Sequence, residues 1–166
     1  MLNLSKDIKM IISDFDGVFT DGSVYISEKN DVQKKLNFKD IMGVYMLIEN
    51  GFDFAIISGE ASNILNYFKD NFNLKEIHGG IRQKDIVLKE IIERNNINSD
   101  EILYIGDDIN DIPAMNLVKF RLAPKNVNPA VIQKVENLQI TNSYGGDGAI
   151  REIADKLIEL RCLKEL

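Results

Sequence analysis

Two short segments of this 166-residue chain are rich in carboxylates, and each directly follows a run of apolar residues. The first segment is Asp-Phe-Asp-Gly at residues 14–17, after the run at residues 10–13. The second is Gly-Asp-Asp-Ile-Asn-Asp at residues 106–111, after the run at residues 102–105. Carboxylates that directly follow buried strands face a substrate and are still held rigidly. Both segments are therefore candidates for catalysis or metal binding.

The first segment combines residue types that suit attack on phosphorus. Asp14 can act as a nucleophile, as carboxylates do in enzymes that form acyl phosphates. Asp16, two residues later, can protonate the leaving oxygen and afterwards activate a water molecule. Gly17 allows the chain to turn sharply between them and the rest of the loop. Taken alone, the same four residues also suit an ordinary capped turn.

The second segment carries three carboxylates, Asp107, Asp108 and Asp111, within five residues of sequence. Three such groups repel one another unless a cation joins them. Ligands that offer oxygen alone, beside a phosphate substrate, favour Mg²⁺. We expect Asp14, Asp107 and the carbonyl of Asp16 to hold this ion. A solvated acidic helix N-terminus is the alternative interpretation.

Two further positions suit the binding of a phosphoryl group. Ser58, Gly59 and Glu60 follow the apolar run at residues 54–57, where a hydroxyl and backbone N–H groups can hold phosphoryl oxygens. Lys84 begins a helical pattern and can balance the charge of phosphate and aspartate. Each signal is weak when taken alone, because such residues are also common in turns and on surfaces.

The elements that must position these residues follow from the apolar pattern. Continuous apolar runs predict strands that are covered on both faces and therefore parallel. These runs lie at residues 10–13, 54–57 and 102–105, with weaker ones at 120–122 and 138–140. Strands that alternate with helices predict a doubly wound α/β domain. In such a sheet the carboxyl ends of the strands share one edge, so the four clusters are expected to converge there.

Helical spacing predicts six helices between and after these strands. They lie around residues 41–50, 64–68 and 87–92, from Asn110 or Asp111 with Pro113 in the first turn, from residues 128–129, and over 149–160. Residues 23–38 break the alternation and predict a β-hairpin with a polar turn at residues 28–31. This insertion follows the first strand, at the edge where the candidate residues gather.

Composition limits the other possibilities. The net charge of −6 and the lack of a long basic run argue against a nucleic-acid partner. The sequence contains no run of about 18 apolar residues, so no membrane span is expected. Residues 1–9 lack a secretory apolar core, and we therefore expect a cytoplasmic protein. Cys162 is the single cysteine, which excludes an internal disulfide. No linker divides the chain, so residues 1–166 are expected to form one domain.

The four clusters together resemble the motifs of the haloacid dehalogenase superfamily of phosphatases, and the resemblance covers nearly the whole chain. The matching segments are Asp14-x-Asp16-Gly-x-x-Thr20-Asp21, Ser58-Gly59, Lys84 and Gly106-Asp107-Asp108-x-x-Asp111. The resemblance implies a Rossmann-like fold, a nucleophilic Asp14, an acid/base Asp16 and a metal-binding Asp107. It also implies that Asp108 and Asp111 support the metal site.

Within the superfamily, the chain resembles the capless 3-deoxy-D-manno-octulosonate 8-phosphate phosphatases. Its length leaves no room for a separate cap domain, and a hairpin follows Thr20-Asp21-Gly22. Residues 145–152 resemble the Gly-Gly-x-Gly-Ala-x-Arg-Glu segment of that group. The resemblance implies a phosphorylated sugar acid as substrate, a place in lipopolysaccharide biosynthesis, and a homotetramer in which one subunit helps to close its neighbour's site.

One residue departs from the pattern of that subfamily. Octulosonate phosphatases usually carry Arg after the glycine of the second motif, whereas this chain has Glu60. A Glu at this position resembles phosphatases that act on nine-carbon, sialic-acid-like 9-phosphates. An acidic side chain cannot pair with a substrate carboxylate as Arg can, although it can accept hydrogen bonds from sugar hydroxyls. The eight-carbon and nine-carbon substrates therefore both remain open.

Other classes of protein fit the sequence less well. A phospho-signalling receiver domain also combines acidic residues, a hydroxyl and a Lys, but its motifs come in a different order. A non-catalytic module of the same fold is not favoured, because all four motif positions are filled. His78 is the single histidine and is interpreted as structural or adjacent to substrate, so no Ser-His-Asp triad is expected.

Overall fold

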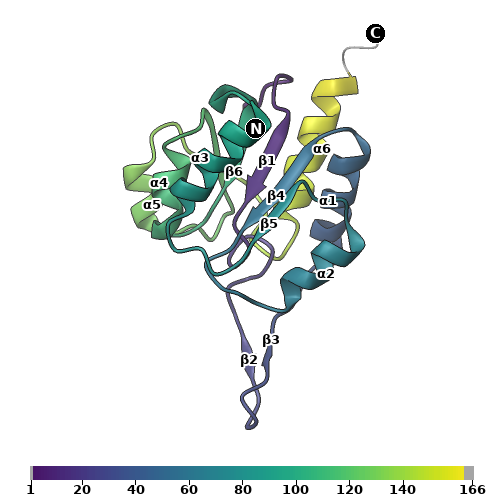
Figure 1. Cartoon of the computed structure of the whole chain (residues 1–166), viewed down its shortest axis with the longest axis vertical. Coiled ribbons are helices and arrows are strands. Elements are labelled where there is room, and N and C mark those ends of the chain that lie inside the picture. The colour runs from purple at the N-terminus through teal and green to yellow at the C-terminus, as the bar shows by residue number, and fades with distance from the viewer. Residues whose placement is uncertain (1, 163–166) are drawn as a thin grey trace.

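A six-stranded parallel sheet forms the centre of the molecule in the computed structural model, which describes residues 2–162 (Figure 1). The strand order is β5-β4-β1-β6-β7-β8, and every neighbouring pair is parallel. The strands are β1 (Met10–Ser13), β4 (Asp53–Ile57), β5 (Glu76–His78), β6 (Ile102–Ile105), β7 (Phe120–Ala123) and β8 (Gln139–Ile140). The predicted doubly wound α/β fold is thereby confirmed. Chain order reverses at β1, where crevices form in such sheets.

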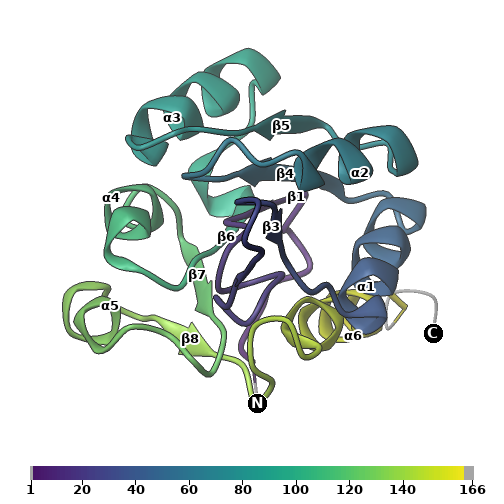
Figure 2. The same cartoon turned by 90° about the horizontal axis from the view of Figure 1, so that it is seen from below.

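Helices cover both faces of the sheet (Figure 2). One side carries α1 (Phe38–Glu49), α2 (Ile64–Asn71) and α6 (Ala149–Cys162); the other carries α3 (Lys84–Asn95), α4 (Ile112–Met115) and α5 (Pro129–Lys134). Two short 3₁₀ turns, η1 (Ser99–Glu101) and η2 (Ile109–Asp111), flank β6. All six predicted helices are present within the described residues.

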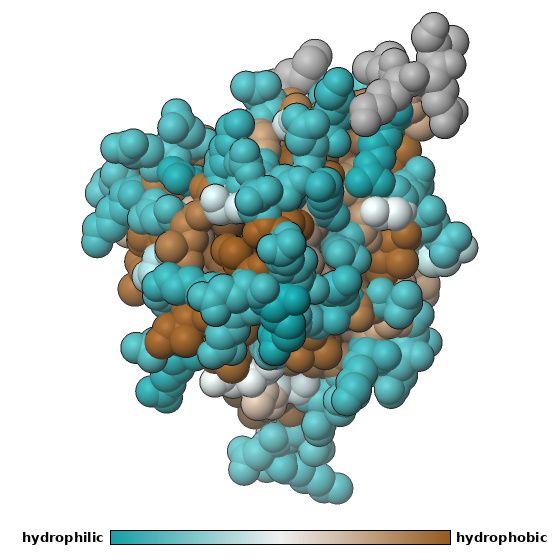
Figure 3. Space-filling model, turned by 45° about the horizontal axis from the view of Figure 1, so that its top comes forward, coloured by the Kyte–Doolittle hydropathy of each residue, from teal (hydrophilic) through white to brown (hydrophobic). Residues whose placement is uncertain are grey.

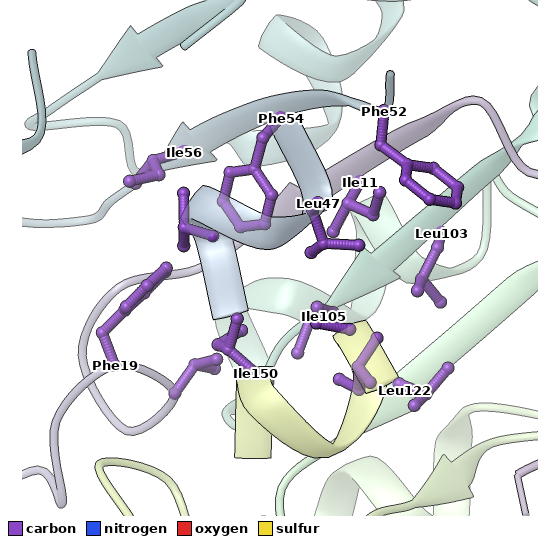
Figure 4. Close-up of a cluster of buried hydrophobic side chains, with 14 of the residues drawn as sticks. Ile11, Phe19, Leu47, Phe52, Phe54, Ile56, Leu103, Ile105, Leu122 and Ile150 are labelled. Carbon is purple, nitrogen blue, oxygen red and sulfur yellow. The ribbon is translucent and has the colours of Figure 1, made fainter. Parts of the chain in front are cut away.

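Apolar side chains from both faces of the strands build two cores. Ile11 of β1 and Phe54 of β4 pack toward α1 and α6 in the core of Figure 4, where Leu47 and Ile150 contact them from the helices. The opposite face of the same strands packs on α3, α4 and α5. All four residues of β1 and of β6 are buried. The loops that follow these two strands therefore start from fixed points.

The hairpin stands apart from this sheet. Its strands, β2 (Tyr25–Ile26) and β3 (Val32–Gln33), pair with each other and project from the carboxyl edge of the main sheet (Figure 1). The hairpin was predicted to reach Phe38, but its second strand is much shorter. The side chain of Asn37 accepts a hydrogen bond from the N–H of Lys39 at 2.9 Å, which caps α1 and starts the helix at Phe38.

Two other predictions need correction. Strand β5 was not predicted, because its sequence Glu-Ile-His contains a single apolar residue and it lies at the edge of the sheet. The fourth helix was predicted to start from a capping Asn110 or Asp111. Asp111 does occupy the N-cap of α4, but its side chain makes no capping bond to that helix, and η2 precedes it.

The surface of the molecule carries both hydrophilic and hydrophobic side chains. Figure 3 shows hydrophilic side chains over most of the visible face, with smaller hydrophobic areas between them. Within residues 2–162, no helix has both the length and the apolar character needed to cross a membrane. Cys162 ends α6 and is exposed. The last four residues of the tail at 160–166 lie outside the described part of the chain.

Candidate active site

The candidate residues converge at the carboxyl edge of the sheet. Asp14 directly follows β1, Ser58 directly follows β4, and Asp107 follows β6 after the intervening Gly106. Lys84 opens α3, which connects β5 to β6. The neighbouring positions of β4, β1 and β6 in the sheet bring these residues together, as the sequence predicted.

Lys84 is the buried cation of the site. Its ammonium lies 2.7 Å from Oδ1 of Asp14 and 2.8 Å from Oδ1 of Asp111, and its side chain is fully buried. Burial alone would lower the pKa of Lys84, but the two carboxylates outweigh burial and raise that pKa above its ordinary value. Lys84 is therefore a permanent positive charge beside Asp14. The alternative that the sequence allowed, an exposed Lys on the surface, is wrong.

Asp111 organises the second acidic segment. Its Oδ1 accepts hydrogen bonds from Lys84 and, at 2.9 Å, from the hydroxyl of the buried Tyr104. Its Oδ2 accepts from the N–H groups of Asp107 at 3.1 Å and Asp108 at 3.2 Å. Both oxygens of Asp111 are thus occupied by donors of the protein. This arrangement fits a residue that fixes the loop more than a direct metal ligand.

The loop after β7 supports the same segment from outside. The backbone N–H of Asn128 donates to the carbonyl of Asp107 at 2.8 Å, and its side-chain amide donates to Oδ1 of Asp108 at 2.8 Å. Asp108 is exposed, in contrast to the buried Asp111. Asp108 therefore lies at the outer rim of the acidic segment.

The acidic residues fit a divalent cation. Oxygens of Asp14, Asp107 and Asp111 all lie within 4.8 Å of one another. Among the buried side-chain nitrogens and oxygens of residues 2–162, Oδ1 of Asp107 is the single atom without a hydrogen-bond partner. A buried carboxylate oxygen with no donor is costly unless a cation contacts it. Hard oxygen donors of this kind match Mg²⁺.

The pKa values of Asp14 and Asp107 also indicate an excess of negative charge at the site. Burial, and then the neighbouring charge of Asp111, raises the pKa of Asp14 from 3.8 to about 7, although Lys84 opposes the change. Burial, and then the charges of Asp14, Asp111 and Asp108, raises the pKa of Asp107 from 3.8 to about 8. The protein alone therefore holds more negative charge here than Lys84 balances.

Close backbone contacts fix the loop that carries Asp14 and Asp16. A Cβ at Gly17 would lie 1.9 Å from Oδ2 of Asp107, and one at Gly145 would lie 1.8 Å from the carbonyl oxygen of Gly17. The side chain of Asn126 donates to that carbonyl at 3.1 Å and accepts from the N–H of Gly145 at 2.7 Å. The glycines are needed because the loops after β1, β6 and β8 meet here without room for side chains.

Ser58 and Gly59 lie between the site and the edge strand. Ser58 is buried, its N–H donates to the carbonyl of His78 at 2.8 Å, and its hydroxyl accepts from the N–H of Glu60 at 3.2 Å. A Cβ at Gly59 would lie 3.5 Å from Nδ2 of Asn110, at an ordinary van der Waals distance. His78 itself pairs with Glu76 at 2.8 Å, which favours the structural interpretation of this histidine.

Asp16 and Glu60 share one cation that the sequence did not reveal. The ammonium of Lys34, which follows β3, lies 2.7 Å from one oxygen of Asp16 and also contacts the carboxylate of Glu60. The neighbouring Lys35 has its side chain largely exposed. Glu60 was expected to accept hydrogen bonds from sugar hydroxyls, and in the structure it is paired with Lys34.

Three contributors were missed by sequence reasoning: Lys34, Tyr104 and Asn126. Tyr104 left one signal, because a phenol within the strand Ile-Leu-Tyr-Ile needs a buried partner for its hydroxyl. Lys34 and Asn126 left none, since adjacent lysines and a loop Asn look alike wherever they point. Their roles depend on the three-dimensional approach of separate loops.

Comparisons with known proteins agree with this geometry. Residues 23–153 match the family model described as haloacid dehalogenase-like hydrolase. The 3-deoxy-D-manno-octulosonate 8-phosphate phosphatase of Yersinia pestis is 28% identical over 158 residues, which cover 95% of this chain and 83% of the relative.

Two solved structures are similar over almost their whole length. The enzyme of the same name from Moraxella catarrhalis, solved with a magnesium ion, a phosphate ion and the sugar acid KDO, has a TM-score of 0.87 at 25% identity, covering 96% of this chain and 93% of that one. The cobalt-bound deoxy-D-mannose-octulosonate 8-phosphate phosphatase of Haemophilus influenzae has a TM-score of 0.86 at 27% identity, covering 95% and 91%.

The chain therefore belongs to the haloacid dehalogenase-like hydrolases, and it is a phosphatase of that family. Within the family, the resemblance to the capless octulosonate 8-phosphate phosphatases is confirmed. Mg²⁺ is the metal of this class of enzyme, and the acidic cluster after β1 and β6 is the candidate site for it.

Proposed function

We propose that this protein hydrolyses the phosphate ester of a 3-deoxy-2-keto sugar acid, 3-deoxy-D-manno-octulosonate 8-phosphate, through a phosphorylated Asp14. The observation that carries the proposal is the position of Asp14. Its carboxylate directly follows a buried strand, contacts the fully buried Lys84 at 2.7 Å, and lies beside an acidic cluster that fits a metal ion. This is the arrangement of a carboxylate nucleophile that needs charge balance against a phosphate dianion.

The reaction proceeds in two steps. An oxygen of Asp14 forms a bond to phosphorus while the ester P–O bond breaks, and Asp16 gives its proton to the leaving sugar oxygen. A water molecule then attacks the phosphorus of the aspartyl phosphate, and Asp16 takes the proton from that water. The bond between Asp14 and phosphorus breaks, inorganic phosphate leaves, and both carboxyl groups return to their starting states.

Other residues hold the phosphoryl group and offset its charge. Lys84 supplies a fixed positive charge. In this proposal, Ser58 and the backbone N–H groups at Gly59 bind phosphoryl oxygens. Asp14, Asp107 and the carbonyl of Asp16 would hold Mg²⁺, with Asp108 and Asp111 in support. When bound, the ion would neutralise the phosphoryl oxygens and withdraw charge from phosphorus.

The relatives support the eight-carbon substrate. The similar proteins from Yersinia pestis and Moraxella catarrhalis are both described as acting on 3-deoxy-D-manno-octulosonate 8-phosphate. Glu60 favours a second candidate, a nine-carbon sialic-acid-like 9-phosphate, because it replaces the Arg that is usual in octulosonate phosphatases. We expect Glu60→Arg to change the kcat/KM ratio of nine-carbon to eight-carbon substrates by roughly tenfold or more.

Assembly into a homotetramer is part of the proposal. Residues 2–162 form no cap over the site, and the hairpin exposes Val24, Tyr25, Ile26 and Val32 to solvent. Apolar side chains gathered on a projecting element are typical of an interface. A neighbouring subunit packed against this hairpin would help to exclude water from the site. Hydrolysis of a small sugar acid phosphate also fits the expected cytoplasmic location.

Phosphate release from an aryl phosphate, with and without Mg²⁺, tests the phosphoryl chemistry. We expect the wild-type protein to need Mg²⁺ and to lose activity in excess chelator. Asp14→Asn nearly preserves shape and should keep the fold, yet lower turnover by several powers of ten. Substantial turnover by purified Asp14→Asn protein, free of contaminating phosphatase, would rule out the aspartyl-phosphate mechanism.

A further inference from the structure

Lys34 is a partly buried residue with a nearly covered side chain on an otherwise exposed element. Both residues of β2 and both residues of β3 are exposed, yet the side chain of Lys34, next in sequence after β3, is only 3% exposed. Its ammonium lies 2.7 Å and 2.8 Å from the two oxygens of Asp16 and contacts one oxygen of Glu60. It also lies 5.9 Å from the centre of the Phe15 ring, within the range of a cation–π interaction.

The carboxylate of Asp16 has few contacts with the rest of the protein. Its side chain is 36% exposed and extends from a loop. Among the hydrogen bonds and ion pairs of residues 2–162, Lys34 is the one side chain that contacts the Asp16 carboxylate. A half-exposed carboxylate without a partner moves among rotamers, whereas proton transfer to a leaving oxygen requires a fixed geometry.

We propose that Lys34 is a positioning residue for Asp16, which it holds from the hairpin of the same subunit, and that Glu60 anchors Lys34 in turn. This inference rests on the proposed function, in which Asp16 gives a proton to the leaving oxygen as the P–O ester bond breaks. It gives the hairpin a role within its own active site, separate from any contact with a neighbouring subunit.

Glu60 explains how Lys34 keeps its position through the reaction. Asp16 carries a proton before the ester bond breaks and lacks it afterwards. A single ion pair between Lys34 and Asp16 would be lost in the first of these states. Because Glu60 pairs with Lys34 independently, the ammonium retains a carboxylate partner in both states, and a charge-assisted pair of this kind holds its geometry well.

Two aryl esters separate this role from sugar recognition. Phenyl phosphate and 4-nitrophenyl phosphate have similar shapes, but the phenolate that leaves the first is more basic and needs the proton more. The kcat/KM values report the steps up to cleavage of the ester bond. We expect Lys34→Met to lower kcat/KM for phenyl phosphate by about tenfold or more, the size of one charged hydrogen bond, and for 4-nitrophenyl phosphate by less than about threefold.

Lys35→Met is the matched control. Lys35 is the next residue, its side chain is 60% exposed, and it lies 3.8 Å from Asp21. It should leave the ratio of the two kcat/KM values at that of the wild type. Glu60→Gln should change the ratio in the same direction as Lys34→Met, and should add nothing when combined with Lys34→Met, because it acts through Lys34.

Equal losses for both esters in Lys34→Met would overturn the inference and leave Lys34 with a structural role alone. No loss for either ester would overturn the inference as well. Additive effects of Glu60→Gln and Lys34→Met would overturn its second part, the anchoring of Lys34 by Glu60. The wild-type protein tests the proposed function separately in the same assay. If it hydrolyses neither ester with Mg²⁺, the proposed function fails, whereas wild-type turnover with an unchanged ratio contradicts the role of Lys34 alone.

Discussion

At the residue scale, the site is dominated by an excess of buried negative charge. Asp14, Asp107 and Asp111 share one buried cation, Lys84, and one oxygen of Asp107 has no donor at all. Such a cluster destabilises the protein unless protons or a metal ion neutralise it. The site therefore links the stability of the fold to pH and to Mg²⁺.

This linkage gives a prediction for Asp107→Asn. The folded-state pKa of Asp107 is raised from 3.8 to about 8, so between these values the folded protein keeps a proton that the unfolded chain releases. Stability of the metal-free protein is therefore lost as pH rises through that window. Asn imitates the protonated group, so Asp107→Asn should melt at least about 3 °C above wild type at pH 8 in chelator, with the difference vanishing near pH 4.

The Mg²⁺ ion should reverse this order. With saturating Mg²⁺ at pH 8, the melting temperature of the wild type should rise, because an ion that binds the folded state stabilises it. Asp107→Asn should respond much less. Differential scanning calorimetry at pH 4, 6 and 8 measures both effects. A metal-free Asp107→Asn protein that is no more stable than wild type at pH 8 would show that Asp107 carries no such strain.

Sequence reasoning identified site residues where several of them lie close together in the sequence. The carboxylates at residues 14–16 and 107–111 were visible as groups, and the structure brings their loops together. Lys34 was missed because its partners, Asp16 and Glu60, come from different loops and approach it in the fold alone. The pairing of Glu60 was missed for the same reason.

At the scale of elements, the loops after β7 and β8 fix the position of the loop that carries Asp14. The backbone of Gly145 touches the carbonyl of Gly17, and Asn126 bridges the two by hydrogen bonds. Close backbone approach of this kind has no space for a methyl group. The loop after β8, which carries none of the candidate catalytic carboxylates, therefore controls the geometry of the loop that does.

Gly145→Ala tests this contact. Its Cβ would lie 1.8 Å from a backbone oxygen, so the loops must separate. We expect a loss of roughly 1–3 kcal/mol, seen as a fall of several degrees in melting temperature, together with a clear loss of kcat. Gly59→Ala is the steric control for stability, because its nearest atom would lie 3.5 Å away. Equal melting temperatures for the two variants would refute the locking role of Gly145.

The hairpin gives a second prediction at this scale. Deleting residues 28–31 removes the turn that joins β2 and β3, which present exposed apolar residues. Assembly and catalysis on sugar acid phosphates should fall together, while hydrolysis of 4-nitrophenyl phosphate should fall less, because it needs few contacts beyond the phosphate. Tyr25→Lys, which keeps the backbone intact, should act in the same direction. Light scattering that reveals a fully active monomer in the wild type would contradict the proposed interface.

Sequence patterns predicted the elements unevenly. The buried strands β1 and β6 were predicted with their correct limits, since continuous apolar runs identify them. The edge strand β5 was missed, because its exposure allows Glu and His in place of apolar residues. The length of the hairpin was overestimated, since Asn37 begins α1 earlier than the apolar pattern indicated.

At the scale of the whole molecule, a six-stranded parallel sheet with helices on both faces places every candidate residue at one edge (Figures 1 and 2). The scaffold needs no cap domain to do this. We propose that the selectivity of this site comes from the hairpin, from Glu60 and from neighbouring subunits. Substrate preference is therefore the property that tests the proposed function most directly.

The most direct measurement compares kcat/KM for 3-deoxy-D-manno-octulosonate 8-phosphate with that for 4-nitrophenyl phosphate, using the wild-type protein in saturating Mg²⁺. Contacts to the sugar acid contribute binding energy that the aryl ester lacks. This energy must outweigh the poorer leaving group of the sugar acid phosphate, because a sugar alkoxide leaves less readily than 4-nitrophenolate. We predict a kcat/KM at least about 100-fold higher for the sugar acid phosphate, equivalent to about 2.7 kcal/mol of added transition-state binding. A sugar acid phosphate that is hydrolysed no better than the aryl ester would contradict the proposed function.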